Sequence, residues 1–173
     1  MKDFAPIFLV GFMGAGKTTV GRALAERLNY RFRDLDDLIV ERTGKSIHQL
    51  FSESGEAEFR RLETEAIRTC RDYEKTVIAL GGGAYVASLN RDLLREIGRT
   101  VWLDCPLEIC LARIEGDKSR PLLATKPEMQ ALLERRLPAY ALADLAIRTE
   151  ARTPAEIAFE IIRSLGEREE AGG

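Results

Sequence analysis

The sequence predicts an α/β fold in which helices cover both faces of a mostly parallel sheet. Short apolar runs alternate with amphipathic stretches along the chain. A glycine-rich loop separates the first apolar run from the first amphipathic stretch, and no apolar segment approaches the roughly 20 residues that cross a bilayer. Strands that alternate with helices are typical of folds whose ligands bind at the carboxyl ends of the strands.

Short runs bounded by glycine, proline or polar residues are expected to form the strands. The second run alternates apolar and polar residues, whereas the first is continuously apolar and ends in the glycine-rich loop. The third run ends in three consecutive glycines. In chain order, the expected strands are 6–11, 30–37, 76–80, 99–106 and 144–149.

The stretches between these runs are expected to form helices. The first places Val20, Leu24 and Leu28 on one face, and the last begins with a capping box in which Thr153 faces Glu156. The expected helices are 18–29, 38–70, 89–98, 107–115, 128–138 and 153–166.

Glycine, proline and polar residues indicate where these helices break or end. The long stretch 38–70 should break at Gly44 and around 52–55. Residues 116–127 are polar and interrupted by proline, which is typical of a mobile loop. The last helix should end at Gly166, and residues 167–173 should fray.

Composition points to one soluble domain that spans residues 1–173. The chain is 45% hydrophobic and 31% charged, which suits a globular protein with a sizeable core. Lysine and arginine are mixed with aspartate and glutamate at a net charge of −2, so no nucleic-acid-binding face is expected. The first apolar run is short and is interrupted by Asp3 and Pro6, unlike a secretory signal. We therefore expect a cytoplasmic protein that binds neither nucleic acid nor membrane.

Cysteine and histidine do not form a recognisable site. Cys70, Cys105 and Cys110 are odd in number, lack C-x-x-C spacing and lie in apolar segments, which favours reduced, buried thiols. The single histidine, His48, cannot by itself build a metal cluster or a catalytic dyad, so a structural or solvated role is expected.

The glycine-rich loop fits the phosphate-binding pattern G-x-x-x-x-G-K-[ST] over residues 11–18. In this pattern, backbone N–H groups surround the phosphates, the lysine reaches the β and γ phosphates, and the hydroxyl binds Mg²⁺. The pattern also needs a strand before it and a helix after it, and both are expected here. Residues 11–18 therefore predict a site for ATP or GTP.

Other charged residues narrow the class of nucleotide-binding protein. The N-K-x-D sequence that binds guanine in GTPases is absent. Motor and remodelling ATPases carry an acidic strand end with a catalytic glutamate, but Asp104, the nearest candidate, is more typical of a strand-end cap. Asp34 and Asp36 would point the same way if 30–37 forms one strand, although a solvated acidic loop is the alternative.

Six motifs occur in order along the chain: GFMGAGKTT, DLD, GEAEFRRLE, LGGGA, SRPLL and RRLPAY. In this order and at these intervals, residues 6–165 resemble the shikimate kinase family, which transfers the γ-phosphoryl group of ATP to the 3-hydroxyl of shikimate in aromatic biosynthesis. The resemblance implies a three-layer P-loop kinase fold with a five-stranded parallel sheet flanked by helices. It also implies a shikimate-binding subdomain at about 36–63, a mobile lid at about 115–127 and a monomer.

The resemblance implies that ATP and Mg²⁺ bind around the first motif. Lys17 would contact the phosphates, while Thr18 and Asp34 would hold the metal and its water shell. Such charge neutralisation suits the loose transition state of phosphoryl transfer. Arg113 and Pro154 would sandwich the adenine ring. The implied ATP-binding residues are Gly14, Ala15, Gly16, Lys17, Thr18, Thr19, Arg113, Arg120 and Pro154.

The resemblance places shikimate among the later motifs. Asp36 would orient the attacking hydroxyl and accept its proton. Arg60 and Arg136 would bind the carboxylate, which planar guanidinium groups suit. Arg120 would move onto the transferring phosphate as the lid closes and excludes water, so that Lys17, Asp36 and Arg120 are the implied catalytic residues. Backbone N–H groups for the same carboxylate would come from Gly81, Gly82 and Gly83.

One position departs from the family pattern, and two other functions stay open. Many members carry a hydroxyl residue where this chain has Ala79, so one contact to the waters of Mg²⁺ is in doubt. A gluconate kinase or a nucleoside monophosphate kinase is the alternative enzyme, and paired arginines do not argue against gluconate. A regulatory module that binds nucleotide without catalysis is the alternative class, which the intact P-loop, aspartates and Arg120 oppose.

Overall fold

The computed structural model describes residues 5–116 and 125–171 of the chain. Within them, five strands form one sheet in the order β2-β3-β1-β4-β5, and every neighbouring pair is parallel. The predicted α/β class with a five-stranded parallel sheet is therefore confirmed. The strands are β1 (Ile7–Val10), β2 (Arg31–Asp34), β3 (Thr76–Ala79), β4 (Arg99–Asp104) and β5 (Leu145–Arg148).

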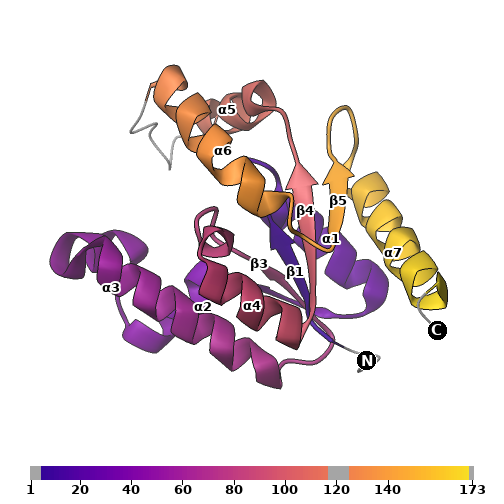
Figure 1. The fold of residues 1–173 in the computed structure, drawn as a ribbon, viewed down its shortest axis with the longest axis horizontal. Helices are drawn as coiled ribbons and strands as arrows, with labels where there is room; N and C mark the ends of the chain where they lie inside the picture. Colours follow the sequence, from indigo (N-terminus) through magenta and orange to yellow (C-terminus); the bar gives the residue numbers. More distant parts are fainter. Residues whose placement is uncertain (1–4, 117–124, 172–173) are drawn as a thin grey trace.

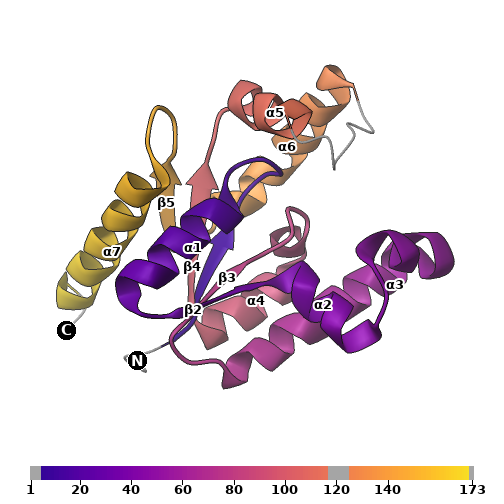
Figure 2. The same cartoon turned by 180° about the vertical axis from the view of Figure 1, so that it is seen from behind.

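Helices cover both faces of the sheet, which gives three layers. Figure 1 shows α4 and α6 in front of the sheet, whereas Figure 2, from behind, shows α1 and α7 in front of it. Helices α2 and α3 extend to one side of the sheet (Figure 1). The α-helices are α1 (Lys17–Leu28), α2 (Leu35–Thr43), α3 (Ile47–Thr69), α4 (Ser88–Ile97), α5 (Leu107–Gly116), α6 (Lys126–Tyr140) and α7 (Pro154–Ala171), and the 3-10 turns are η1 (Cys70–Asp72) and η2 (Ala84–Val86).

The central strands form the core because helices shield them on both sides. All residues of β1 and β3 are buried. β1 reads Ile-Phe-Leu-Val without alternation, as expected of a parallel strand with no solvent-facing side. The edge strand β5 alternates buried and exposed residues instead. The loops at the carboxyl ends of the central strands therefore start from a rigid scaffold.

The described part of the chain bears out a further expectation about the core. The three cysteines are buried and none forms a disulfide, as the sequence predicts. No described helix combines the length and apolarity that crossing a membrane requires.

Two glycines break the helices where the sequence predicts. α2 ends at Gly44, which adopts a left-handed conformation with φ of 68° and donates its N–H to Val40 O. α3 bends at Gly55, whose φ of 77° and ψ of 175° are rarely open to residues with side chains. Because the bend precedes Arg60, it sets the direction of the helical segment that carries this side chain.

The predicted strand 30–37 is too long at its carboxyl end. β2 ends at Asp34, whose Oδ1 accepts a hydrogen bond from Asp36 N at 3.0 Å and so caps α2. Asp36 and Asp37 lie in the first turn of α2, where acidic side chains interact favourably with the helix dipole. The interpretation that Asp34 and Asp36 extend from one strand is therefore wrong, although the cap still brings them together.

The helix predicted to end at Pro138 continues to Tyr140. A proline this close to a helix end removes only one late hydrogen bond. The side chain of Tyr140 is fully buried, and its hydroxyl donates to Gly82 O, so tertiary contacts hold the last turn in place.

The helix predicted to end at Gly166 continues to Ala171, and the fraying expected of residues 167–173 stays a prediction. The residues after Gly166 are good helix formers, and Arg163 Nε lies 3.7 Å from Glu167 Oε1 across the next turn. Most of the expected lid, 115–127, lies outside the described residues, and Arg120 lies there too.

Candidate active site

The P-loop joins β1 to α1 and directs backbone groups toward the carboxyl end of the sheet. Gly14 and Gly16 have φ of 76° and 95°, and a Cβ at Gly14 would lie 2.5 Å from Cys110 O. Glycine is therefore required at Gly14 for both conformation and space. Gly16 caps α1 without a side chain, which leaves the first N–H groups of the helix open to an anion.

Lys17 lies folded back onto the P-loop. Its Nζ donates to Gly11 O and Phe12 O, each at 2.8 Å. Burial lowers the pKa of Lys17 to about 8, although the charges of Asp34 and Asp36 oppose the shift. The ammonium group of Lys17 is therefore more easily deprotonated than that of an ordinary lysine.

Thr18 and Asp34 provide oxygen ligands of the kind that Mg²⁺ prefers. Thr18 Oγ1 lies 3.5 Å from Asp34 Oδ2. No group of three or more His, Cys, Asp or Glu side chains among the described residues could hold a metal by itself. A hydroxyl and one carboxylate instead suit Mg²⁺, which usually keeps several waters and completes its shell with phosphates.

A cavity of about 420 Å³ joins the P-loop to the carboxyl ends of β2 and β3. It brings together residues that the sequence predicts for nucleotide, metal and acceptor binding, at the edge where parallel sheets bind ligands. It is lined by Met13, Gly14, Gly16, Lys17, Thr18, Thr19, Asp34, Asp36, Leu80, Gly81, Gly82, Arg113 and Ile114.

The glycine triplet after β3 lies against both predicted arginines. A Cβ at Gly83 would lie 2.7 Å from both Nη atoms of Arg60, and a Cβ at Gly82 would lie 3.0 Å from Arg136 Nη1. Arg60 comes from α3 and Arg136 from α6. The structure thus brings together two cations that lie far apart in the sequence, and larger residues in the triplet would displace them.

Two carboxylates lie beside the same triplet. A Cβ at Gly81 would lie 3.1 Å from Glu63 Oε1 and 3.5 Å from Asp36 Oδ1. Arg60 Nη1 forms an ion pair with Glu63 Oε2 at 2.8 Å, and Arg60 Nη2 lies 3.3 Å from Glu56 Oε1. The side-chain cluster around the triplet therefore offers both guanidinium donors and carboxylate acceptors.

Sequence reasoning missed Glu63. Its side chain is 1% exposed, and burial raises its pKa against the opposing effect of Arg60. Glu63 Oε1 and Arg136 Nη1 are buried and have no hydrogen-bond partner among the described residues, an arrangement that favours binding of a polar ligand. The spacing of Glu63 three residues after Arg60 on one helix was the available signal.

Arg113 and Pro154 line a second cavity, of about 200 Å³, on the other side of the P-loop. Arg113 Nη1 donates to Gly14 O at 3.1 Å, which ties α5 to the loop. Ala15, Gly16 and Thr19 line this cavity as well. The predicted adenine-site residues therefore lie together, next to the phosphate-binding loop.

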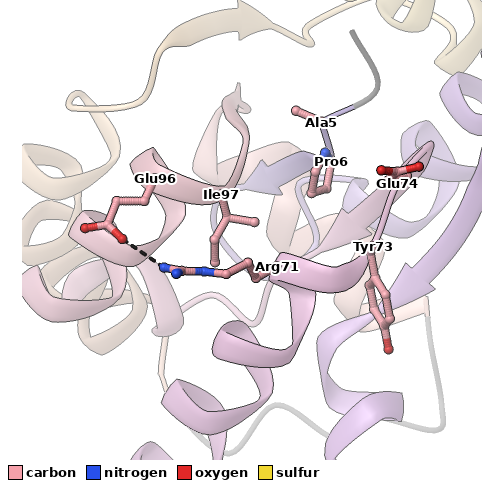
Figure 3. Close-up of a pocket in the computed structure, with 7 residues that line it drawn as sticks. All are labelled: Ala5, Pro6, Arg71, Tyr73, Glu74, Glu96 and Ile97. Atoms are coloured by element: carbon pink, nitrogen blue, oxygen red, sulfur yellow. Dashed lines mark hydrogen bonds and ion pairs between the residues drawn. The ribbon is translucent and has the colours of Figure 1, made fainter. Parts of the chain in front are cut away.

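A cavity of about 270 Å³ at the amino ends of the strands contains none of the predicted site residues. It lies beside Pro6, which precedes β1, and Tyr73 and Glu74, which precede β3 (Figure 3). Arg71 pairs with Glu96 at 2.9 Å across it, but both side chains are more than half exposed, so the pair contributes little stability. The residues predicted for the site lie instead around the cavity at the carboxyl ends of the strands.

Comparison with known proteins agrees with this geometry. A curated shikimate kinase from Geobacter sulfurreducens is 51% identical over 162 residues, which cover 92% of this chain and 90% of that protein. The structure of a shikimate kinase from Acinetobacter baumannii in complex with shikimate has a TM-score of 0.87 and 38% identity, with 96% of each chain covered. A gluconokinase from Sinorhizobium meliloti, at 23% identity and a TM-score of 0.71, shares the fold.

The family comparison covers the same segment as the motifs. A family model described as shikimate kinase matches residues 13–166, from the P-loop through most of α7. Because the match spans most of the chain and the curated relative is so similar along it, the chain belongs to the shikimate kinase family.

Proposed function

We propose that this protein transfers the γ-phosphoryl group of ATP to the 3-hydroxyl of shikimate, which yields shikimate 3-phosphate and ADP for aromatic biosynthesis. One observation carries the proposal: Arg60 and Arg136 reach the same glycine triplet from separate helices, beside Asp36 and Glu63. Two guanidinium groups suit a carboxylate, and carboxylate side chains suit the hydroxyls of a small polyol. The shikimate named in the A. baumannii structure has both kinds of group.

Nucleotide binding is assigned to the P-loop and its neighbours. Backbone N–H groups at the start of α1 hold the phosphates, and Lys17 exchanges its carbonyl contacts for phosphate oxygens. Thr18 and Asp34 would hold Mg²⁺, which would supply positive charge to neutralise the phosphates. Arg113 and Pro154 bind the adenine ring from the neighbouring cavity.

The acceptor is activated by Asp36. Its carboxylate orients the 3-hydroxyl and accepts the hydroxyl proton as the oxygen bonds to the γ-phosphorus. The bond between that phosphorus and the oxygen shared with the β-phosphate breaks, and ADP leaves. Arg120 is assigned to the transferring phosphate on the basis of the sequence alone, because it lies outside the described residues.

A coupled assay of ADP release separates this function from the alternatives. ATP and Mg²⁺ are supplied with shikimate, gluconate, nucleoside monophosphates or water alone. We expect rapid ADP release only with shikimate. Faster ADP release with gluconate than with shikimate would support a gluconate kinase instead. If no acceptor increases ADP release, a regulatory nucleotide-binding module would be favoured. Light scattering of the same sample tests the proposed monomer.

A further inference from the structure

We propose that Tyr140, Thr64 and Asn90 are positioning residues, which set the separation of Arg60 and Arg136. They do so by connecting α3 and α6, the helices that carry these arginines, to residues 81–84 after β3, the glycine loop. The inference rests on the proposed function, because it concerns the grip on the acceptor carboxylate. It goes further by assigning roles to three side chains that do not line the cavity around the P-loop.

The α6 side of the loop is tied by Tyr140. Tyr140 lies four residues after Arg136, so both side chains project from one face of α6. Its hydroxyl donates to Gly82 O at 2.5 Å, and its side chain is fully buried. Arg136 Nη1 would lie 3.0 Å from a Cβ at the same Gly82. The residue that Arg136 contacts is therefore held by the helix that carries Arg136.

The α3 side of the loop is tied through Asn90 on α4. Thr64 Oγ1 donates to Asn90 Oδ1 at 2.8 Å, and Asn90 Nδ2 donates to Ala84 O at 2.9 Å. Asn90 is 1% exposed, so water does not readily replace these bonds. Ala84 directly follows Gly83, against which the Arg60 guanidinium lies.

The two hydrogen-bonded connections start at the same spacing from their arginines. Thr64 follows Arg60 by four residues, just as Tyr140 follows Arg136. Each arginine is thus followed, one turn later, by a hydroxyl that starts a hydrogen-bonded path to a carbonyl at residue 82 or 84. Thr64 Oγ1 also lies 3.0 Å from Arg60 O, so its single proton is shared between the helix and Asn90.

This arrangement addresses a physical difficulty of the acceptor site. Two guanidinium groups that face one small space repel each other, and α3 and α6 are separate elements of the fold. A bidentate grip on a carboxylate requires positioning within about 0.5 Å. The glycine loop is hydrogen-bonded to α6 through Tyr140 and to α3 through Asn90 and Thr64. It therefore holds the two guanidinium groups at the spacing that a carboxylate needs.

The test uses Tyr140→Phe and Thr64→Val, which remove one hydroxyl each while keeping side-chain size. We expect each to raise the KM for shikimate by about 10-fold, the equivalent of one hydrogen bond, and to leave the KM for ATP within about twofold. The ratio of the KM for the uncharged carboxamide to the KM for shikimate should fall as well. Thr64→Ser, which keeps the hydroxyl, should restore the parent values.

Two control variants each remove one hydroxyl group at another place in the fold. Tyr85→Phe removes a buried hydroxyl that donates to Leu142 O at 3.2 Å, and Thr76→Val removes one that donates to Glu74 O at 2.8 Å. Thermal unfolding is measured for all variants. The controls should lose comparable stability but keep the parent KM for shikimate within about twofold, because neither hydroxyl bonds to residues 82–84 or to Asn90.

The outcomes distinguish this inference from the function on which it rests. If the parent enzyme does not turn over shikimate, the proposed function fails. If the parent is active but Tyr140→Phe leaves the KM for shikimate unchanged, or raises both KM values together, the positioning role is overturned. Equal effects in the control variants would also overturn it, since the loss would then follow stability alone. If Thr64→Val does not fold, Tyr140→Phe alone decides.

Discussion

Arg60 and Glu63 form an ion pair across one turn of α3, with Nη1 of Arg60 2.8 Å from Oε2 of Glu63. The arginine is partly exposed, whereas the glutamate is almost completely buried. Removing a carboxylate from water is costly, so this pair stays favourable only while the cation remains in place. Glu63 therefore restricts the position of Arg60 before any ligand arrives.

Stability should depend on pH through Glu63. Burial raises the pKa of Glu63 in the folded chain above its ordinary value of 4.5. A carboxyl of this kind stabilises the fold below pH 4.5, and this contribution is lost as the pH rises through the folded-state pKa. Glu63→Gln cannot ionise, so the variant should gain stability relative to the parent as the pH rises from 4.5.

Urea unfolding of both proteins without substrate, across this pH range, measures the effect. Glu65→Gln removes a partly exposed carboxyl from the same helix and serves as the control. A stability difference between Glu63→Gln and the parent that does not change with pH would contradict the prediction.

Loss of either arginine should weaken binding of the acceptor alone. Arg60→Ala or Arg136→Ala should lower shikimate affinity by roughly 30-fold to several thousand-fold, the usual cost of about 2 to 5 kcal/mol for truncating one partner of a desolvated charge pair. ATP affinity should barely change, and the double variant should lose less than the sum. Calorimetric titration of shikimate, its carboxamide and ATP checks this. Equal binding of acid and carboxamide by the parent would refute the carboxylate grip.

ATP binding should weaken above pH 8, because that is about where Lys17 loses its charge in the free protein. Phosphate favours the charged lysine, so binding in this range should take up a proton. Calorimetry in two buffers of different ionisation enthalpy measures the uptake. Lys17→Ala should abolish this uptake and turnover while the fold stays intact. Residual turnover above about a tenth of the parent would remove Lys17 from the mechanism.

Asp36→Asn should preserve the shape of the acceptor site while removing the proton acceptor. The kcat/KM for shikimate should fall by at least about two orders of magnitude, as is typical when a general base is lost. Steady-state kinetics with shikimate varied at saturating ATP provide the measurement. A change of less than about threefold would make Asp36 a bystander.

Ala79→Ser should strengthen binding of Mg²⁺. Ala79 is buried in β3 and pairs in register with Asp34 of β2, so a hydroxyl there would lie near the metal-binding edge of the sheet. The apparent dissociation constant for Mg²⁺ should fall by up to about 10-fold, the lower range for contacts around metal ligands. Titration of Mg²⁺ at fixed ATP tests this. An unchanged dissociation constant would show that Ala79 does not weaken the binding of Mg²⁺.

Local patterns predicted most of the framework. The order of strands and helices, the P-loop between β1 and α1, and the breaks at Gly44 and Gly55 each depend on neighbouring residues, whose preferences sequence reveals directly. Local patterns did not predict where β2 and α6 end. The cap at Asp34 ends β2, and the hydrogen bond from Tyr140 to Gly82 holds the last turn of α6. Both depend on contacts that only the folded chain supplies.

The site shows the same division. Motifs predicted which arginines and glycines belong together, and the fold places them side by side. The motifs assigned no role to Glu63, which burial distinguishes, or to Asn90, whose partners lie on other elements. Arg120, which the sequence alone assigns to the lid, stays a prediction.

The strand order β2-β3-β1-β4-β5 places most of the residues proposed for the acceptor on one half of the sheet. Asp36 and the glycine triplet follow β2 and β3, while Arg113 and Pro154, which are proposed for the nucleotide, follow β4 and β5. Arg136 crosses this division, because it lies on α6 between β4 and β5. A change of acceptor would therefore need changes on the β2–β3 half together with a change at Arg136.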